Sequence, residues 1–172
     1  ELTAQVGGRL VDVSDALVSG GRFDAGETLA RIDPSDYRNA VRQAEAQVTQ
    51  ARFQLIQARE QAGAARADYQ RLRERTGTAP EPDSTELGRL VFNEPQVAQA
   101  EANLQSAKAS LETAEINLER TRLQVPFDGM VRQKQADLGA YLAPGTPVAT
   151  VYGTEAAEIV VSLPSRKAAL IR

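Results

Sequence analysis

The fold is decided by residues 37–72, YRNAVRQAEAQVTQARFQLIQAREQAGAARADYQRL. Apolar or small residues recur along this stretch in alternating steps of four and three, from Tyr37 through Leu55 to Leu72. This spacing places one narrow apolar seam along one side of a helix, which is the pattern of a coiled coil. The residues beside the seam are mostly Arg, Glu, Gln, Asn and Asp, so the other faces of the helix are expected to lie in water.

The same spacing returns in a second stretch, at Val97, Ala100, Leu104, Ala107, Leu111, Ala114, Leu118 and Thr121. Asp33 and Pro34 form a helix start before the first stretch, whereas Gly77 and the prolines that follow it end that helix. The sequence therefore predicts an antiparallel α-helical coiled-coil hairpin over 34–122. We expect helices at 34–75 and 94–122, joined by a tip at 76–93.

The segments on either side of this hairpin, 1–33 and 123–153, have the alternation and turn residues of short strands. They also repeat one another, since Phe23, Gly26, Leu29 and Ile32 have the same spacing as Leu142, Gly145, Val148 and Val151. Neither half has enough apolar surface to fold alone. We therefore predict an α+β fold in which the two halves form one split β-sandwich and the hairpin is inserted between them.

Composition excludes several classes of function. The 172 residues carry a net charge of −3 with scattered Lys and Arg, which argues against a nucleic-acid partner. The chain has no Cys, which rules out disulfides and Cys-ligated zinc, and no His, the commonest general base. No run of about 20 apolar residues is present, so we expect no membrane span in this piece. Because it starts without Met and stops after a strand-like run, we expect a fragment from which any signal peptide or anchor has been trimmed.

No residue pattern predicts chemistry. The three lysines, Lys108, Lys134 and Lys167, do not lie where a β-domain would present a lysine for lipoylation or biotinylation. Carboxylates at helical spacing, such as Glu112 and Glu115, are typical of a solvated helix face. We therefore expect no enzyme activity, no catalytic or metal-binding residues and no cofactor.

The order of parts resembles the periplasmic adaptor family, the membrane fusion proteins of tripartite efflux pumps (RND/HlyD-like). The matching residues are Val18-x-x-Gly21-x-x-x-x-Gly26-x-x-Leu29-x-x-Ile32-Asp33-Pro34-x-x-Tyr37, Ala44-Glu45-Ala46-Gln47, Asn117-Leu118-x-Arg120-Thr121, Val125-Pro126-Phe127-Asp128-Gly129-x-Val131 and Gly139-x-Tyr141-Leu142-x-x-Gly145-Thr146-Pro147. The resemblance implies that the β-domain is lipoyl/biotinyl-like. It also implies that 154–172 begin a truncated β-barrel domain.

The resemblance also implies a function, in which the protein bridges the inner and outer membranes. An adaptor of this kind would link an inner-membrane efflux transporter, with the RND type favoured, to an outer-membrane TolC-type channel for export of drugs or other small molecules. It would lie in the periplasm, attached to the inner membrane of a Gram-negative bacterium, and would assemble with itself as a trimer or hexamer. Two alternatives stay open: an adaptor of an ATP-driven or major-facilitator exporter, and a coiled-coil scaffold without a role in transport.

The resemblance also indicates two sets of surface residues. At the hairpin tip, docking to the outer-membrane channel would use Arg71, Leu72, Arg75, Thr76, Gly77, Leu87 and Leu90. Apolar residues off the seam are the candidates for adaptor self-association, namely Phe53, Ile56 and Ile116.

Overall fold

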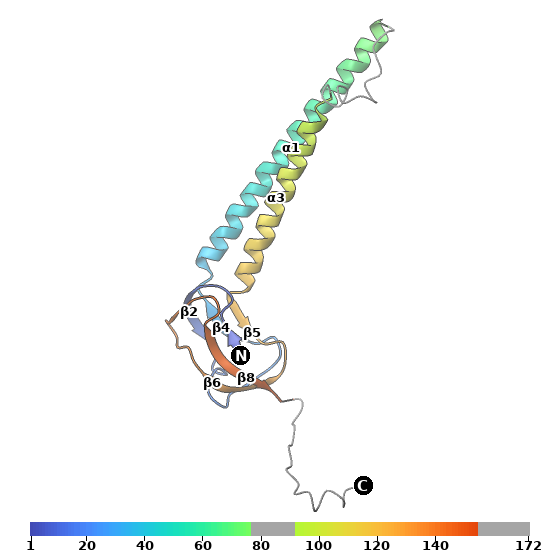
Figure 1. Ribbon diagram of the computed structural model, residues 1–172. Helices are drawn as coiled ribbons and strands as arrows, with labels where there is room; N and C mark the ends of the chain where they lie inside the picture. Colours follow the sequence, from blue (N-terminus) through green and yellow to red (C-terminus); the bar gives the residue numbers. More distant parts are fainter. Residues whose placement is uncertain (77–91, 155–172) are drawn as a thin grey trace, which may run out of the picture. The chain divides into compact units, whose positions relative to one another are not determined.

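The computed structural model describes residues 1–76 and 92–154 (Figure 1). The chain divides into two compact units, which we treat separately. The β unit is built from Glu1–Asp33 together with residues 121–154. The helical unit is Pro34–Arg120. The predicted combination of helix and sheet is confirmed, whereas the expected barrel start lies outside the described residues.

The β unit contains two four-stranded sheets, with strand orders β1-β8-β6-β3 and β5-β4-β2-β7. Each sheet combines strands from both halves of the sequence, and the pairs between them are antiparallel. The strands are β1 Leu2–Thr3, β2 Gly8–Val13, β3 Arg22–Phe23, β4 Thr28–Ile32, β5 Arg122–Gln124, β6 Gly129–Lys134, β7 Tyr141–Leu142 and β8 Pro147–Gly153.

Large apolar side chains from both halves form the core of the β unit. Those that are completely or almost completely buried are Leu10, Leu17, Leu29, Ile32, Val131 and Val148. Leu10 and Val131 occupy corresponding places, because β2 and β6 each pair with the strand that follows the turn in their own half. The shared core explains why the two halves combine into one unit.

The sequence repeat corresponds to two matching turns. Gly26 has φ 80° and Gly145 has φ 86°, a left-handed conformation that favours glycine because a Cβ at positive φ crowds the residue's own backbone. Each turn glycine donates its N–H to a carbonyl across the unit, Gly26 to Val125 at 2.8 Å and Gly145 to Ala4 at 2.7 Å. The two halves are thus related by structure as well as by sequence.

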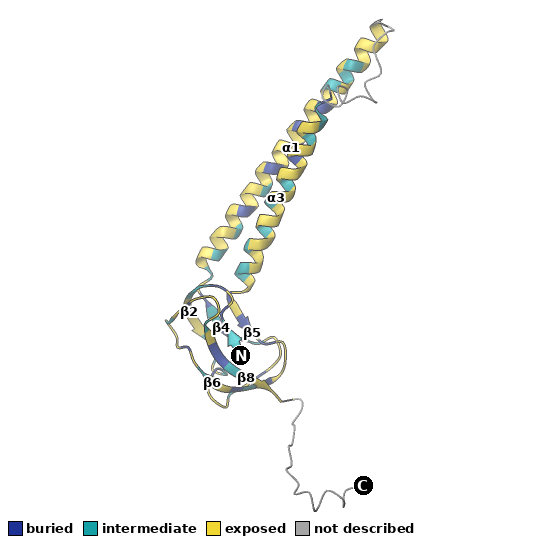
Figure 2. Cartoon of the chain, in the orientation of Figure 1, coloured by how far each residue is buried: buried dark blue, intermediate teal, exposed yellow. Residues whose placement is uncertain are grey.

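The helical unit consists of α1, Ser35–Thr76, and α3, Glu94–Glu119. The helices run in opposite directions, since Arg59 pairs with Glu101 and the later Arg66 pairs with the earlier Glu94. Figure 2 shows buried and half-buried positions following the line along which the helices meet. Among the predicted seam residues of α1, every one from Tyr37 to Tyr69 is buried or half-buried, and Leu72 is exposed.

Two details at the helix starts differ from the simplest expectation. The first helix starts at Ser35, one residue later than expected, and the carbonyl of Pro34 accepts a helical hydrogen bond from Arg38. Asn93 stands at the N-cap of α3, where Asn is a preferred capping residue, but with φ 54° its side chain makes no capping hydrogen bond. Among the described residues, neither helix is both long and apolar enough to cross a membrane.

The return helix also ends earlier than predicted, at Glu119 rather than Arg122. Thr121 continues the seam spacing, yet it is only 1% exposed and belongs to the β unit. Its carbonyl accepts a hydrogen bond from the N–H of Ile32 at 2.8 Å, which extends the pairing of β4 with β5. Thr121 therefore pairs with the sheet and is not part of the helix.

Candidate interaction surfaces

An aromatic cluster lies at the start of α3. The rings of Tyr69 and Phe92 meet edge to face, with centroids 5.5 Å apart, and Phe92 is buried. The Arg66 guanidinium lies 5.8 Å from the centre of the Phe92 ring and also pairs with Glu94 at 3.1 Å. Edge-to-face rings and cations over aromatic faces are favourable arrangements, so this cluster fixes where the chain enters α3.

The predicted docking residues are only partly described. Arg71, Leu72 and Arg75 are exposed on the last turns of α1, and Arg71 pairs with Asp68 one turn back at 3.2 Å. Thr76 is the final residue of the helix. Gly77, Leu87 and Leu90 lie outside the described residues. The described part of this set thus gathers at one end of α1.

The three predicted self-association residues are all on the surface of the helical unit. Phe53 is 59% exposed, Ile56 is 51% exposed and Ile116 is 40% exposed. Phe53 and Ile56 lie one turn apart on α1, whereas Ile116 is on α3. At about 100° per residue, Phe53 and Ile116 point away from the seam of their own helices, so the structure does not bring them together.

Two ion pairs join the helices on one side of the seam. The Arg59 Nη2 atom lies 2.7 Å from the Glu101 Oε1 atom, and the second pair is Arg66 with Glu94. The Arg59 and Glu101 side chains are 61% and 50% exposed, so water screens their attraction. These pairs set the register of the helices rather than supply much stability.

A double-mutant cycle checks that conclusion. We expect Arg59→Ala and Glu101→Ala to show a coupling free energy below about 1 kcal/mol, because exposed ion pairs are weak and screened by salt. The measurement is urea unfolding of the two single variants and the double variant at low and high salt. A coupling that is large and unchanged by salt would contradict this assignment.

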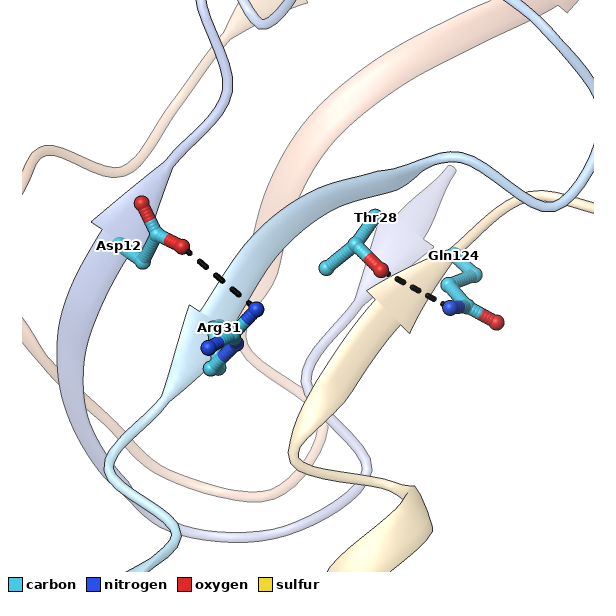
Figure 3. Close-up of polar contacts among 4 residues, drawn as sticks. All are labelled: Asp12, Thr28, Arg31 and Gln124. Atoms are coloured by element: carbon cyan, nitrogen blue, oxygen red, sulfur yellow. Dashed lines mark hydrogen bonds and ion pairs between the residues drawn. The ribbon is translucent and has the colours of Figure 1, made fainter.

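Polar contacts on the β unit connect neighbouring strands, both between the two halves and within the first half (Figure 3). The Gln124 amide donates a hydrogen bond to the Thr28 hydroxyl at 2.9 Å, joining β5 to β4. Arg31 of β4 and Asp12 of β2 form an ion pair at 3.8 Å. In the described ranges no group of three or more His, Cys, Asp or Glu residues is placed to hold a metal ion. The two polar contacts therefore hold neighbouring strands of the β unit together.

The comparison with protein families agrees with this order of elements along the chain, in which a helical pair is inserted between two sets of strands. Residues 1–154 match the family model described as RND MFP, barrel-sandwich hybrid domain. The chain belongs to this family of membrane fusion proteins. The match includes both halves of the β unit and the helical unit between them.

Individual members of the family resemble the chain over most of its length. The multidrug resistance protein MdtA of Yersinia enterocolitica is 29% identical over 165 residues, and MdtA of Yersinia pestis is 30% identical over 168 residues. Both alignments cover 95% of this chain but 34% of the relative. The chain therefore spans about a third of the length of these curated relatives.

Solved structures show the same fold. MacA from Actinobacillus actinomycetemcomitans superposes with a TM-score of 0.73 at 23% identity, covering 89% of this chain and 48% of MacA. ZneB from Cupriavidus metallidurans gives a TM-score of 0.53 at 20% identity, covering 90% of this chain and 60% of ZneB. At these identities the likeness concerns the fold of the membrane fusion proteins.

Two features of the helical unit were not predicted from the sequence. Phe92 lies within the predicted tip, yet it is buried and its ring meets that of Tyr69, a residue of the first seam. The signal was an aromatic residue just before the helix start, opposite the only aromatic residue near that end of the first seam. The second feature is a difference in charge between the two sides of the helical pair. Sorting the residues of both helices by heptad position would have revealed it.

Proposed function

We propose that the chain is the central part of a periplasmic adaptor that bridges an inner-membrane efflux transporter of the RND type to an outer-membrane channel. In this proposal the exported molecules are drugs or other small molecules. The adaptor lies in the periplasm, is attached to the inner membrane and assembles with copies of itself. It carries out no chemistry and binds no cofactor.

The observation that carries the proposal is the match of residues 1–154 to the RND membrane fusion protein family. The names of the MdtA relatives, which describe multidrug resistance proteins, support the class of exported molecule. The helical unit fits the role of a spacer, because a helix of 42 residues is roughly 63 Å long. We infer that α1 and α3 form a coiled-coil hairpin whose far end docks to the channel.

A single-cysteine experiment tests the bridge. These 172 residues contain no cysteine, so one introduced Cys reports on one position once any cysteine elsewhere in the full-length protein has been replaced. We expect Arg75→Cys in the full-length protein, treated with a bifunctional crosslinker in intact cells, to give an adduct with an outer-membrane channel. The measurement is identification of the adduct by mass spectrometry, and the reason is that Arg75 is exposed at the last turn of α1.

Arg38→Cys is the matched control, since Arg38 is also an exposed arginine of α1 but lies roughly 55 Å away along the helix. The bridge predicts an outer-membrane adduct from Arg75 and none from Arg38. Adducts from Arg75 with an inner-membrane partner alone would contradict the bridge. Adducts only with other copies of the adaptor would instead favour a scaffold without transport.

A further inference from the structure

The helical pair has two chemically different edges. At about 100° per residue, Arg59 and Gln54 lie about 70° to either side of the seam line between Leu55 and Ala58. The charged edge is the side of Arg59, where residues seven apart carry charges, among them Arg52 and Arg66 on α1 and Glu94, Glu101 and Lys108 on α3. It also holds both ion pairs between the helices.

The opposite side is here named the amide edge. Its positions run in steps of three and four from Ala40 to Gln61 on α1 and from Gln96 to Asn117 on α3. All of them are Ala, Gln, Asn, Ser or Thr, in a chain of which 25% is charged. Helix faces that only contact water do not need to avoid charge, and centres of protein interfaces are depleted in charged residues. The composition of the amide edge therefore indicates a contact surface.

The amide edge also contains the two grooves of the helical unit that are relevant to such a contact. One, shallow and wide open to solvent, is lined by Gln54, Ala58, Gln99, Ala100 and Asn103 among others. A second, of about 330 Å³, lies further along the same edge and includes Gln47 and Asn117. Alanine at the floor of the first groove leaves room for a side chain from outside, and the Gln99 and Asn103 amides, 3.0 Å apart, border it.

The same chain carries two exposed apolar side chains, Phe53 and Ile56, which are here named the knob. Phe53 lies almost opposite the seam, so it cannot reach the groove of its own helical pair. The register of the ion pairs places Ile56 level with Leu104, and hence within about 2 Å of the height of Asn103. Two copies standing side by side at equal height thus bring the knob of one to the groove of the next.

We propose that the groove of the amide edge receives Phe53 and Ile56 of a second copy of this chain, with both helical pairs pointing in the same direction. This inference rests on the proposed function, in which every adaptor points from the inner membrane outward. The contact joins two different surfaces, so it repeats from copy to copy and closes a ring where the rotation permits. It uses two of the three predicted self-association residues, while Ile116 takes no part in it.

Disulfide trapping between two differently tagged copies of the full-length protein tests the contact. One copy carries Ile56→Cys and the other Asn103→Cys, and we expect a mixed disulfide after mild oxidation. The matched control pairs Ile56→Cys with Gln105→Cys, because Gln105 lies at nearly the same height but on the other side of α3. Adding Phe53→Asp to the first pair is expected to lower its yield about tenfold, since burial of a Phe is lost.

A second pair tests the direction. Ala46 is two turns from Phe53 on the same face, and the same register places Thr113 of the amide edge within about 2 Å of its height. Ala46→Cys with Thr113→Cys is expected to form a disulfide between parallel copies and not between antiparallel ones.

The inference is overturned if Ile56→Cys reacts no better with Asn103→Cys than with Gln105→Cys, or if the Ala46 and Thr113 pair fails. An adduct of Arg75→Cys with an outer-membrane channel in the same cells would then leave the proposed function standing. Loss of that adduct would overturn the proposed function as well, so the two failures are distinguishable.

Discussion

Gly129→Ala is expected to destabilise the β unit by about 3 kcal/mol or more, because there is no space for a Cβ at this position. A Cβ on Gly129 would overlap the carbonyl oxygen of Tyr152 in the neighbouring strand and would lie 2.8 Å from the ring of Phe23. The Tyr152 oxygen belongs to the backbone, so it cannot move aside without separating β6 from β8. The expected fall in melting temperature is more than about 10 °C.

Gly153→Ala is the matched control, since Gly153 is the partner of Gly129 across the same pair of strands. A Cβ on Gly153 would make ordinary contacts, the nearest at 3.6 Å from the Phe127 ring. Hydrogen exchange measured by mass spectrometry on peptides from β6 and β8 separates the β unit from the helices. Equal protection of the two variants would show that the strands tolerate a Cβ at Gly129.

Leu10→Ala is the second substitution with a large expected effect, about 2–5 kcal/mol of lost stability. The Leu10 side chain is completely buried, and its strand β2 pairs with β4 on one side and β7 on the other. Truncation leaves a cavity in the core shared by both halves, so the halves are held together less tightly. Denaturant unfolding followed by the circular dichroism of the tyrosines measures the effect.

Val11→Ala provides the comparison for Leu10→Ala. Val11 is 45% exposed and lies at the irregularity in the pairing of β2 with β4, where Leu10 and Asp12 face successive residues of the partner strand. We expect this variant to change stability by about 0.5 kcal/mol or less, as for surface substitutions in general. A loss as large as that of Leu10→Ala would mean that β2 turns a different face to the core.

Features of the helical unit that depend on nearby residues could be predicted from the sequence, whereas features that depend on distant residues could not. The spacing of Val48, Leu55 and Ala62 is a property of the helix itself, and these residues are buried or half-buried as expected. Thr121 has the same spacing, yet the helix ends before it because its carbonyl bonds to the distant Ile32. No local pattern contains that competition between helix and sheet.

The β unit shows the same limit. The repeat of Gly26 and Gly145 predicted two equivalent turns, because a left-handed conformation is a demand on one residue. Which strands pair could not be predicted, since β4 is joined to β5 by irregular registers such as the one between Thr28 and Ala30. The candidate docking residues followed from family resemblance, and the described ranges place only Arg71, Leu72, Arg75 and Thr76.

Insertion of the helical pair within the β unit has a consequence for the order of folding. The Ala25 N–H donates to the Asp128 carboxylate across 103 positions of sequence, so a chain without helices would have to close a long loop to make that contact. Once the helices have paired, Tyr37 and Asn117 line one groove, and the ends of the insertion are already neighbours. We therefore expect nucleation in the helices first, with the sheets condensing onto chain ends whose closure entropy has already been lost.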